Sequence, residues 1–292
     1  MPHADLAALA DAATRLLPPS AGHEPQWVRA HPDLGILRHP RRTSFEGAVY
    51  EPAVVVVLQG RKETLLGADT YPMGPGECLL VSHDLPVVAR ITQAPYLALV
   101  FDIDVDTLRE LADALQAAGA AWPERPARGL GVHAIDAPLV DALRRHLACA
   151  ATPADALALG PLVAREIHYR LATAASGGAL RDLVRPGSHA GAIGRAIAHL
   201  RREFRSPIEI PELARSVGMS ASSFHKHFKA VTASSPLQYR KGLQLMEARR
   251  LLRAGAVAVS SAAFDVGYES AAQFSRDYAR RFGAPPKNDL AG

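Results

Sequence analysis

Cysteine and long apolar runs are what this sequence of 292 residues has least of. Only Cys78 and Cys149 occur, too few and too far apart for a disulfide framework or a thiolate metal site. The longest apolar run, Ala53–Leu58, is far below the roughly 20 residues that span a bilayer. Asp5 and Asp11 interrupt the first residues, which favour a short amphipathic helix over a signal peptide. We expect a cytoplasmic protein without a membrane partner.

Motifs that would mark an enzyme are also missing. There is no Gly-x-Ser-x-Gly stretch, and Gly74-Pro75-Gly76 is a turn because no Gly-Lys-Ser/Thr follows it. His83 has no histidine close to it on the expected strands, whereas a metal site needs three or four convergent ligands. We therefore expect no catalytic residue, no metal and no cofactor, with His83 in a loop. Cys78 is expected to pack as a small apolar side chain rather than act as a redox sensor.

Charge is distributed unevenly along the chain. From Gly187 onward there are 16 Lys and Arg residues against 8 Asp and Glu, a net charge of +8. The preceding part holds 17 against 21, a net charge of −4, which accounts for the total of +4. A basic C-terminal third on an acidic body is typical of nucleic-acid-binding proteins, although basic helices also serve solubility.

The segment from Tyr50 to Asp102 has the pattern of short β-strands. Turn residues such as Gln59-Gly60 and Gly74-Pro75-Gly76 separate its apolar runs. Strands this short at regular spacing predict a small barrel or jelly roll. The expected strands are Val54–Leu58, Leu65–Leu66, Leu79–Val81, Val87–Ile91 and Tyr96–Phe101.

Helical periodicity begins at Asp106 and is broken at the Pro- and Gly-rich stretch Pro123–Gly131. It resumes at Pro138–Cys149 and Leu159–Ala174. A linker is expected at Arg185–Ser188, and beyond it the sequence predicts helices joined by short turns.

The last hundred residues contain an internal repeat. Glu212–Met219 aligns with Ser261–Tyr268 at an offset of 49 residues, and Phe224–Phe228 aligns with Phe274–Tyr278 at an offset of 50. Two copies in register favour a functional duplication over a chance repeat in an all-helical dimerisation domain.

Each copy has the parts of a helix-turn-helix. Gly218 and Gly267 follow a short first helix, where a left-handed residue ends the helix and permits a sharp turn. Ser220 suits the N-cap of the second helix. Met219 and Phe224 have the spacing of a hydrophobic staple, which fixes how the chain enters that helix.

The second helix of each copy is expected to bury its aromatic residues and to present its other face to DNA. The expected DNA-contacting residues are Ser222, Ser223, His225, Lys226 and Lys229 in the first copy, and Ser270, Ala271, Ala272, Ser275 and Arg276 in the second. Arg240 and Lys241 in the following helix are expected to contact phosphates or to be surface charges.

A single helix is predicted between the copies, starting at Ser235-Pro236 and running for nineteen residues to about Arg253, with an inner apolar stripe that includes Leu245 and Leu252. At 1.5 Å per residue it is about 28 Å long. This length is comparable with the ~34 Å between successive major-groove segments on one side of B-DNA. One chain can therefore place both second helices in adjacent major-groove segments.

Residues from about 190 to 289 resemble the DNA-binding domain of the AraC/XylS transcription regulators. The matching stretches are Leu213–Ser220, Phe224–Lys229, Ser235–Arg240, Ala248–Leu252 and Val266–Arg276. One departure is Asp289, which stands where Tyr239 stands in the first copy.

The N-terminal half is similar to the cupin-like domain found in one subgroup of that family. The similar stretches are Tyr50–Pro52, Val57–Lys62, Gly74–Gly76 and Asp84–Val87. The resemblance implies an α+β fold: an N-terminal cupin-like β-barrel (jelly roll), a helical middle layer and an all-α C-terminal domain with two helix-turn-helix motifs.

The resemblance also implies that Lys226 and Arg276 reach base edges. Arg276 can make a bidentate contact to guanine, whereas Lys226 suits a phosphate contact almost as well. His225 is expected either to contact DNA or to be solvated. Ala271 and Ala272 either contact a thymine methyl group or simply permit close approach.

The predicted boundaries are residues 1–24 for an N-terminal helix, 25–118 for the cupin-like β effector domain, 119–186 for a helical dimerisation or coupling segment and 187–292 for the DNA-binding domain. Within the last, the motifs are placed at about 211–232 and 260–282, with the linker helix at 236–254.

The function that we predict is sequence-specific transcription regulation on double-stranded promoter DNA. The N-terminal domain is expected to sense a small-molecule effector or to mediate homodimerisation, and contact with RNA polymerase is left open. One alternative is a barrel enzyme or small-molecule binder whose helical tail does not touch DNA. Another is a DNA-repair methyl acceptor, which needs an activated cysteine cluster that two lone cysteines do not supply.

Overall fold

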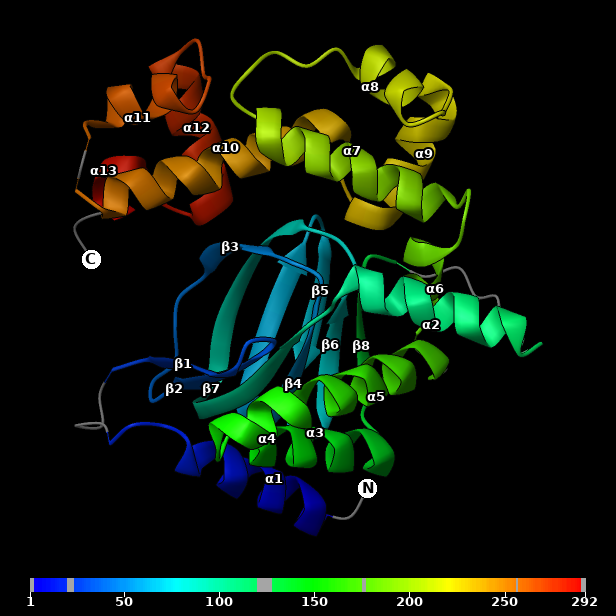
Figure 1. The fold of residues 1–292 in the computed structure, drawn as a ribbon. Coiled ribbons are helices and arrows are strands. Elements are labelled where there is room, and N and C mark those ends of the chain that lie inside the picture. The colour runs from blue at the N-terminus through cyan, green and yellow to red at the C-terminus, as the bar shows by residue number, and fades with distance from the viewer. Residues whose placement is uncertain (1–2, 20–23, 120–127, 175–176, 256, 290–292) are drawn as a thin grey trace.

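The computed structural model describes residues 3–19, 24–119, 128–174, 177–255 and 257–289 (Figure 1). An antiparallel sheet domain forms the centre. Helices of the N-terminal half pack on one side of it, and the C-terminal helices lie across its opposite end (Figure 1). In the part of the chain that the structure describes, no helix combines the length and apolar character needed to cross a membrane.

The sheet has eight strands in the order β1-β2-β7-β4-β6-β8, with β3 also paired to β7 and β5 to β4. Among the described residues β1 and β8 end this path without pairing to each other, so the expected barrel is an unclosed sheet. The strands are β1 Gln26–His31, β2 Leu34–His39, β3 Glu46–Tyr50, β4 Ala53–Leu66, β5 Asp69–Met73, β6 Glu77–Val81, β7 Leu85–Asp102 and β8 Leu130–Ala134.

The expectation of uniformly short strands is wrong for β4 and β7. The turn expected at Gln59-Gly60 lies inside β4, where the pairing with β7 shifts register around Gln59 and Gly60 has a φ of +75°. A bulge of this kind inserts an extra residue and bends a strand without ending it. β7 likewise joins the runs Val87–Ile91 and Tyr96–Phe101 into one strand.

Both faces of the sheet are buried, which explains the unbroken apolar run in β4. Val54 and Val56 face a core shared with the N-terminal helices, whereas Val55 and Val57 face a second core between the strands. A strand buried on both faces loses the alternation of apolar and polar residues.

The helices of this half cover the first of those cores. Leu143 of α3 and Ile167 of α5 pack there against Phe101 of β7. The helices are α1 His3–Arg15, α2 Val105–Ala117, α3 Ala137–Cys149, α4 Pro153–Ala158, α5 Gly160–Thr173 and α6 Gly178–Val184.

Strand β8 lies in the range for which helices alone were expected, and it pairs with β6. Most of the break expected at Pro123–Gly131 falls outside the described residues, although Leu130 and Gly131 begin β8. The sheet is therefore completed by a segment that follows α2.

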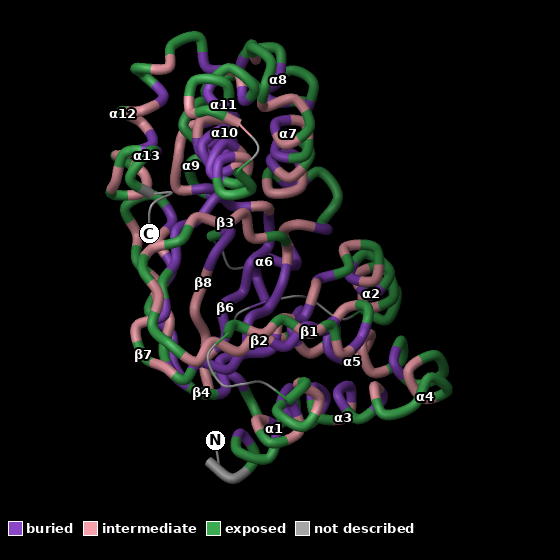
Figure 2. The backbone as a smooth tube through the Cα atoms, turned by 90° about the vertical axis from the view of Figure 1, so that its left-hand side faces the viewer, coloured by how far each residue is buried: buried purple, intermediate pink, exposed green. Residues whose placement is uncertain are grey.

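The C-terminal part is entirely helical. Figure 2 shows the buried residues of α10 lying inside this group of helices, with exposed residues on its outer turns. Its helices are α7 His189–Glu203, α8 Ile210–Ser216, α9 Ala221–Thr232, α10 Pro236–Arg253, α11 Val259–Asp265, α12 Ala271–Phe282 and α13 Pro286–Asp289.

Candidate nucleic-acid interface

The first helix-turn-helix consists of α8 and α9. Gly218 lies between them with a φ of +77°, the left-handed conformation that the sequence predicted. The hydroxyl of Ser220 accepts a hydrogen bond from the backbone N–H of Ser223 at 3.3 Å and so caps α9. Met219 and Phe224 are buried in the same core, which confirms the hydrophobic staple.

The second helix-turn-helix consists of α11 and α12 and repeats this geometry. Gly267 has a φ of +89°. The hydroxyl of Ser270 accepts a hydrogen bond from the backbone N–H of Gln273 at 3.3 Å and caps α12. Ser270 was expected to point toward DNA, but its side chain is engaged at the start of the helix.

Aromatic side chains anchor both second helices. Phe224 and Phe228 are fully buried, with ring centroids 5.4 Å apart. Phe274 and Tyr278 repeat the arrangement in α12 at 5.5 Å. Burying these rings turns the remaining face of each helix outward.

Helix α10 belongs to both units at once. Tyr239 and Leu243 in its first half lie in the core of the first unit, whereas Leu245 and Leu252 in its second half lie in the core of the second. Phe204 packs against both cores. With 18 residues, α10 is about 27 Å long, which holds the two units a fixed distance apart.

The outward faces carry the expected cations. Lys226 and Lys229 on α9 and Arg276 on α12 are exposed, as is His225. Among the other expected contact residues, Ser222 and Ala272 are exposed, and Ser223 and Ala271 are half-buried.

Three other expected residues already have partners within the protein. The hydroxyl of Ser275 donates to the main-chain oxygen of Ala271 at 2.9 Å. Arg240 donates through Nε to the main-chain oxygen of Phe204 at 2.8 Å, and burial lowers the pKa of Arg240. Lys241 lies 3.1 Å from a carboxylate oxygen of Asp277, so it joins α10 to α12.

The DNA-binding helices are also bonded to the sheet domain, which sequence reasoning missed. The Tyr239 hydroxyl donates to the main-chain oxygen of Asp84 at 2.7 Å, and Arg281 donates to that of Pro86 at 2.8 Å. Arg201 of α7 lies 2.8 Å from carboxylate oxygens of both Glu51 and Asp84. In the sequence, Asp84–Val87 is one of the stretches similar to the cupin-like domain, and that resemblance carries no information about its partners.

Two residues singled out in the sequence have structural roles. His83 lies in a loop as expected, but it is buried, with Nε2 3.0 Å from the main-chain oxygen of Ala190. Cys78 is buried in β6, and burial raises the pKa of its thiol to about 12. A thiol held protonated in this way is a poor nucleophile at neutral pH, which agrees with its expected packing role.

A sheet domain joined to paired helix-turn-helix units defines a class of transcription regulators. Residues 30–179 match the family model of the AraC-type transcriptional regulator N-terminus, and residues 213–291 match a helix-turn-helix domain model. The chain therefore belongs to the AraC-type transcriptional regulators, a family of regulators rather than enzymes.

Similar proteins include a probable thc operon regulatory protein from Rhodococcus erythropolis, 29% identical over 192 residues that cover 65% of this chain and 51% of that protein. The HTH-type transcriptional regulator CdhR of Pseudomonas aeruginosa is 31% identical over 134 residues, 46% of this chain and 37% of that protein. The chain thus matches about half or less of the length of these relatives.

Among solved structures, unsaturated fatty acid bound ToxT from Vibrio cholerae aligns with a TM-score of 0.53 at 9% identity. The alignment covers 90% of this chain and 96% of ToxT. Identity this low establishes a shared fold and nothing further.

Proposed function

We propose that this protein binds double-stranded promoter DNA sequence-specifically, with α9 and α12 in successive major-groove segments. The observation that carries the proposal is that one continuous helix, α10, contributes to the cores of both helix-turn-helix units. In each unit the aromatic residues are buried and the cations are exposed. A recognition helix in the major groove reads base edges with the residues on such an outward face.

Arg276 and Lys226 are assigned to base edges in this proposal, because they are exposed at equivalent positions of α12 and α9. Arg276 suits guanine, which accepts a bidentate contact in the major groove. His225 and Lys229 are assigned to bases or phosphates at the flanks of the first site, and Ala272 to a thymine methyl group.

The remaining residues are assigned positioning roles. Ser222 and Ser223 at the start of α9 suit phosphate contacts through a hydroxyl or a backbone N–H. Ser270, Ala271 and Ser275 set the start of α12 and its close approach to the groove. Arg240 and Lys241 hold α10 to its neighbours and contribute positive charge near the backbone.

The experiment is site selection from random DNA with the full-length protein, followed by footprinting on the selected sequence. The proposal expects a site with two protected segments about one helical turn apart. Protection of a single segment would mean that only one of the two helix-turn-helix units contacts DNA. Equal affinity for selected and scrambled DNA would overturn sequence-specific binding altogether.

We also propose that the sheet domain takes an anionic small-molecule effector. The Lys62 ammonium lies 5.3 Å and 5.9 Å from the ring centroids of Tyr50 and Tyr96, and the Glu46 carboxylate is near enough to favour its charged form without forming an ion pair with it. The Tyr96 hydroxyl is buried without a hydrogen-bond partner in the described structure. A ligand carboxylate would satisfy both groups, and ToxT has been solved with a fatty acid bound.

The effector is tested by titrating the protein with medium- and long-chain fatty acids while following intrinsic tryptophan fluorescence. Saturable binding that Lys62→Met weakens at least tenfold supports the site. Binding that Lys62→Met leaves unchanged would place any effector elsewhere.

We also propose that the protein is cytoplasmic and contacts RNA polymerase at the promoter. Finally, we propose that it forms a homodimer through α4 and α5. Leu157 of α4, Leu159 between the two helices and Leu162 of α5 are 82%, 48% and 65% exposed, and Tyr169 of α5 is 43% exposed. Large apolar side chains exposed close together on adjacent helices are typical of a protein–protein interface.

A further inference from the structure

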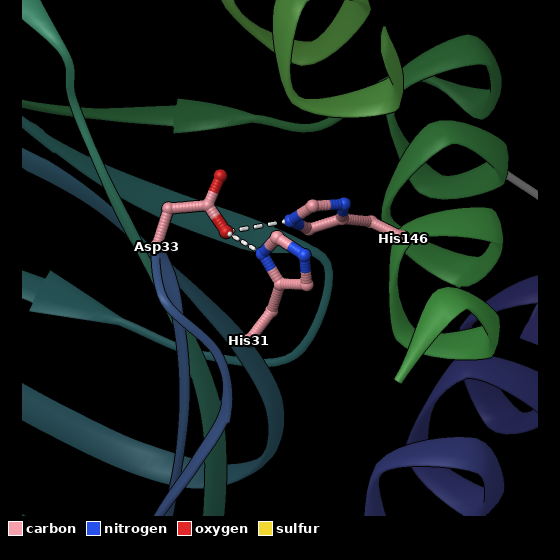
Figure 3. Close-up of side chains that lie close together, drawn as sticks. All are labelled: His31, Asp33 and His146. Atoms are coloured by element: carbon pink, nitrogen blue, oxygen red, sulfur yellow. Dashed lines mark hydrogen bonds and ion pairs between the residues drawn. The ribbon is translucent and has the colours of Figure 1, made fainter. Parts of the chain in front are cut away.

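Three potential metal ligands that are far apart in the sequence meet between the sheet and α3 (Figure 3). His31 ends β1, Asp33 lies in the turn that follows, and His146 lies in the last turn of α3. One carboxylate oxygen of Asp33 lies 2.6 Å from Nδ1 of His31 and 2.7 Å from Nε2 of His146. The three donor atoms all lie within 4.8 Å of one another.

The hydrogen bonds of the neutral His31 ring place two hydrogen-bond acceptors, Nδ1 of His31 and a carboxylate oxygen of Asp33, opposite each other. Nε2 of His31 lies 3.2 Å from the main-chain oxygen of Ala156, which can only accept, so Nε2 carries a hydrogen. In a neutral ring Nδ1 then carries a lone pair, and it faces a carboxylate oxygen at 2.6 Å. Two acceptors at this distance repel each other, and separating them slightly would leave a pair of donor atoms that a metal ion could bridge.

The surroundings hold these groups in place. His146 is fully buried and His31 nearly so, and their ring centroids lie 4.4 Å apart. Phe101 lies edge-on to His146 at 5.8 Å. A β-carbon on Gly160 would lie 2.3 Å from Nε2 of His31, so the start of α5 passes directly over the ring. Asp33 retains side-chain exposure of 25%, which leaves an entry path from solvent.

We propose that His31, Asp33 and His146 bind a divalent transition-metal ion of the zinc class, through Nδ1, one carboxylate oxygen and Nε2. Imidazole and carboxylate ligands suit such ions, and a solvent molecule supplies the fourth position. The bond from Nε2 of His31 to the Ala156 carbonyl is the outer contact that orients a metal-bound histidine.

The fit requires the Asp33 oxygen to move away from both nitrogens. Zinc bonds of about 2.0–2.2 Å in a tetrahedral site place neighbouring donor atoms about 3.3 Å apart. The distances from the Asp33 oxygen to the two nitrogens, 2.6 Å and 2.7 Å, must therefore each lengthen by about 0.6–0.7 Å. Asp33 is the residue best able to move, because it lies in a turn and is the most exposed of the three.

Such an ion would join the β1–β2 turn to the end of α3, fixing the helical layer against the sheet. It lies outside the DNA-binding helices, so its presence does not depend on their proposed role. No metal was expected from the sequence, in which His146 lies 113 positions from Asp33.

The test uses untagged full-length protein stripped with EDTA and titrated with Co²⁺ at pH 7.5, followed by calorimetry with Zn²⁺. The expected result is visible d–d absorption that saturates at one ion per chain and is displaced by Zn²⁺. Asp33→Asn keeps the side-chain shape and is expected to weaken binding at least tenfold, with unchanged circular dichroism.

The matched control is His227→Gln. His227 and His189 form another close imidazole pair, with ring centroids 3.8 Å apart at the surface, where metal ions bind adventitiously. His227→Gln should leave the Co²⁺ spectrum unchanged. Loss of the spectrum in His227→Gln, no saturable binding, or an Nδ1–H signal of His31 by nitrogen-15 NMR that persists with Zn²⁺ present would each overturn the metal site.

Discussion

The main-chain oxygen of Arg205 lies 2.2 Å from the position that a β-carbon on Gly267 would occupy. Nothing within 4 Å meets the equivalent β-carbon on Gly218, although both glycines have positive φ angles. The two turns thus share a backbone conformation but differ in what surrounds them. Gly267 lies against the segment that follows α7, whereas Gly218 faces open space.

Alanine substitutions at the two glycines should therefore differ in cost. Gly218→Ala carries only the left-handed backbone penalty of about 1–2 kcal/mol. Gly267→Ala carries a similar penalty and must also displace the Arg205 carbonyl, so we expect a clearly larger loss in the free energy of unfolding. Urea denaturation of both variants measures the difference. Equal costs would mean that the segment at Arg205 moves aside freely.

Arg276→Ala should relax the preference for one base position. Losing a bidentate guanine contact costs about 1–3 kcal/mol of discrimination. The matched control is Arg280→Ala, one turn further along α12, where the exposed Arg280 pairs with Asp277 at 3.4 Å. We expect Arg280→Ala to weaken all sequences alike. Binding to a panel of single-base variants of the selected site distinguishes the two, and identical profiles would contradict the assigned role of Arg276.

DNA affinity should fall steeply with salt. Six or more phosphate contacts predict a loss of about 10³-fold or more between 50 and 200 mM salt. Fluorescence anisotropy with a labelled duplex measures the slope. A nearly flat salt dependence would favour a helical domain that does not engage the DNA backbone.

Acidification should lower the free energy of unfolding through protonation of His83. Burial lowers the pKa of His83 from 6.5, an effect that the Ala190 carbonyl and Asp84 partly offset. The unfolded chain therefore takes up a proton first as the pH falls. The stability contribution of neutral His83 is complete above about pH 6.5 and is lost as the pH falls through the lowered pKa.

Urea denaturation between pH 7.5 and 5 checks this expectation. His83→Gln should flatten the pH dependence, because glutamine cannot take up the proton. His199→Gln on α7 is the control and should leave the dependence unchanged. A His83→Gln profile that parallels the wild-type profile would show that other groups cause the acid loss.

Leu162→Glu should shift a dimer toward monomer, since a carboxylate would be desolvated in the proposed α4–α5 interface. Leu237→Glu is the matched control, because Leu237 is also exposed, at 51%, but lies on α10. Sedimentation equilibrium of both variants measures the shift. A dimer that survives Leu162→Glu must use another surface.

The two helix-turn-helix units could be predicted from the sequence because the residues that define them act locally. A glycine at the turn, the Ser220 cap and aromatic residues four apart act within one or two helical turns, and each was found where expected, whereas Ser270 was expected to face DNA and caps α12 instead. The long strands could not be predicted in the same way. Gly60 has the left-handed backbone that a turn requires, and only pairing with a distant strand shows that it forms a bulge.

Contacts between distant segments were the least predictable part. Lys241 was expected to contact a phosphate or to be a surface charge, yet it forms an ion pair with Asp277, and a lysine on a basic helix gives no sign of such a partner. His31 and His146 likewise carry no mark in the sequence of their shared carboxylate. The fold that brings them together is set by apolar packing elsewhere.

The bonds from Tyr239 to Asp84 and from Arg281 to Pro86 reach carbonyls only two positions apart in the chain. Tyr239 belongs to the core of the first helix-turn-helix unit, and Arg281 lies on α12 of the second. A displacement of this short peptide would therefore pull on both helix-turn-helix units at once, and in the proposed DNA complex it would change the phase at which the pair meets the double helix.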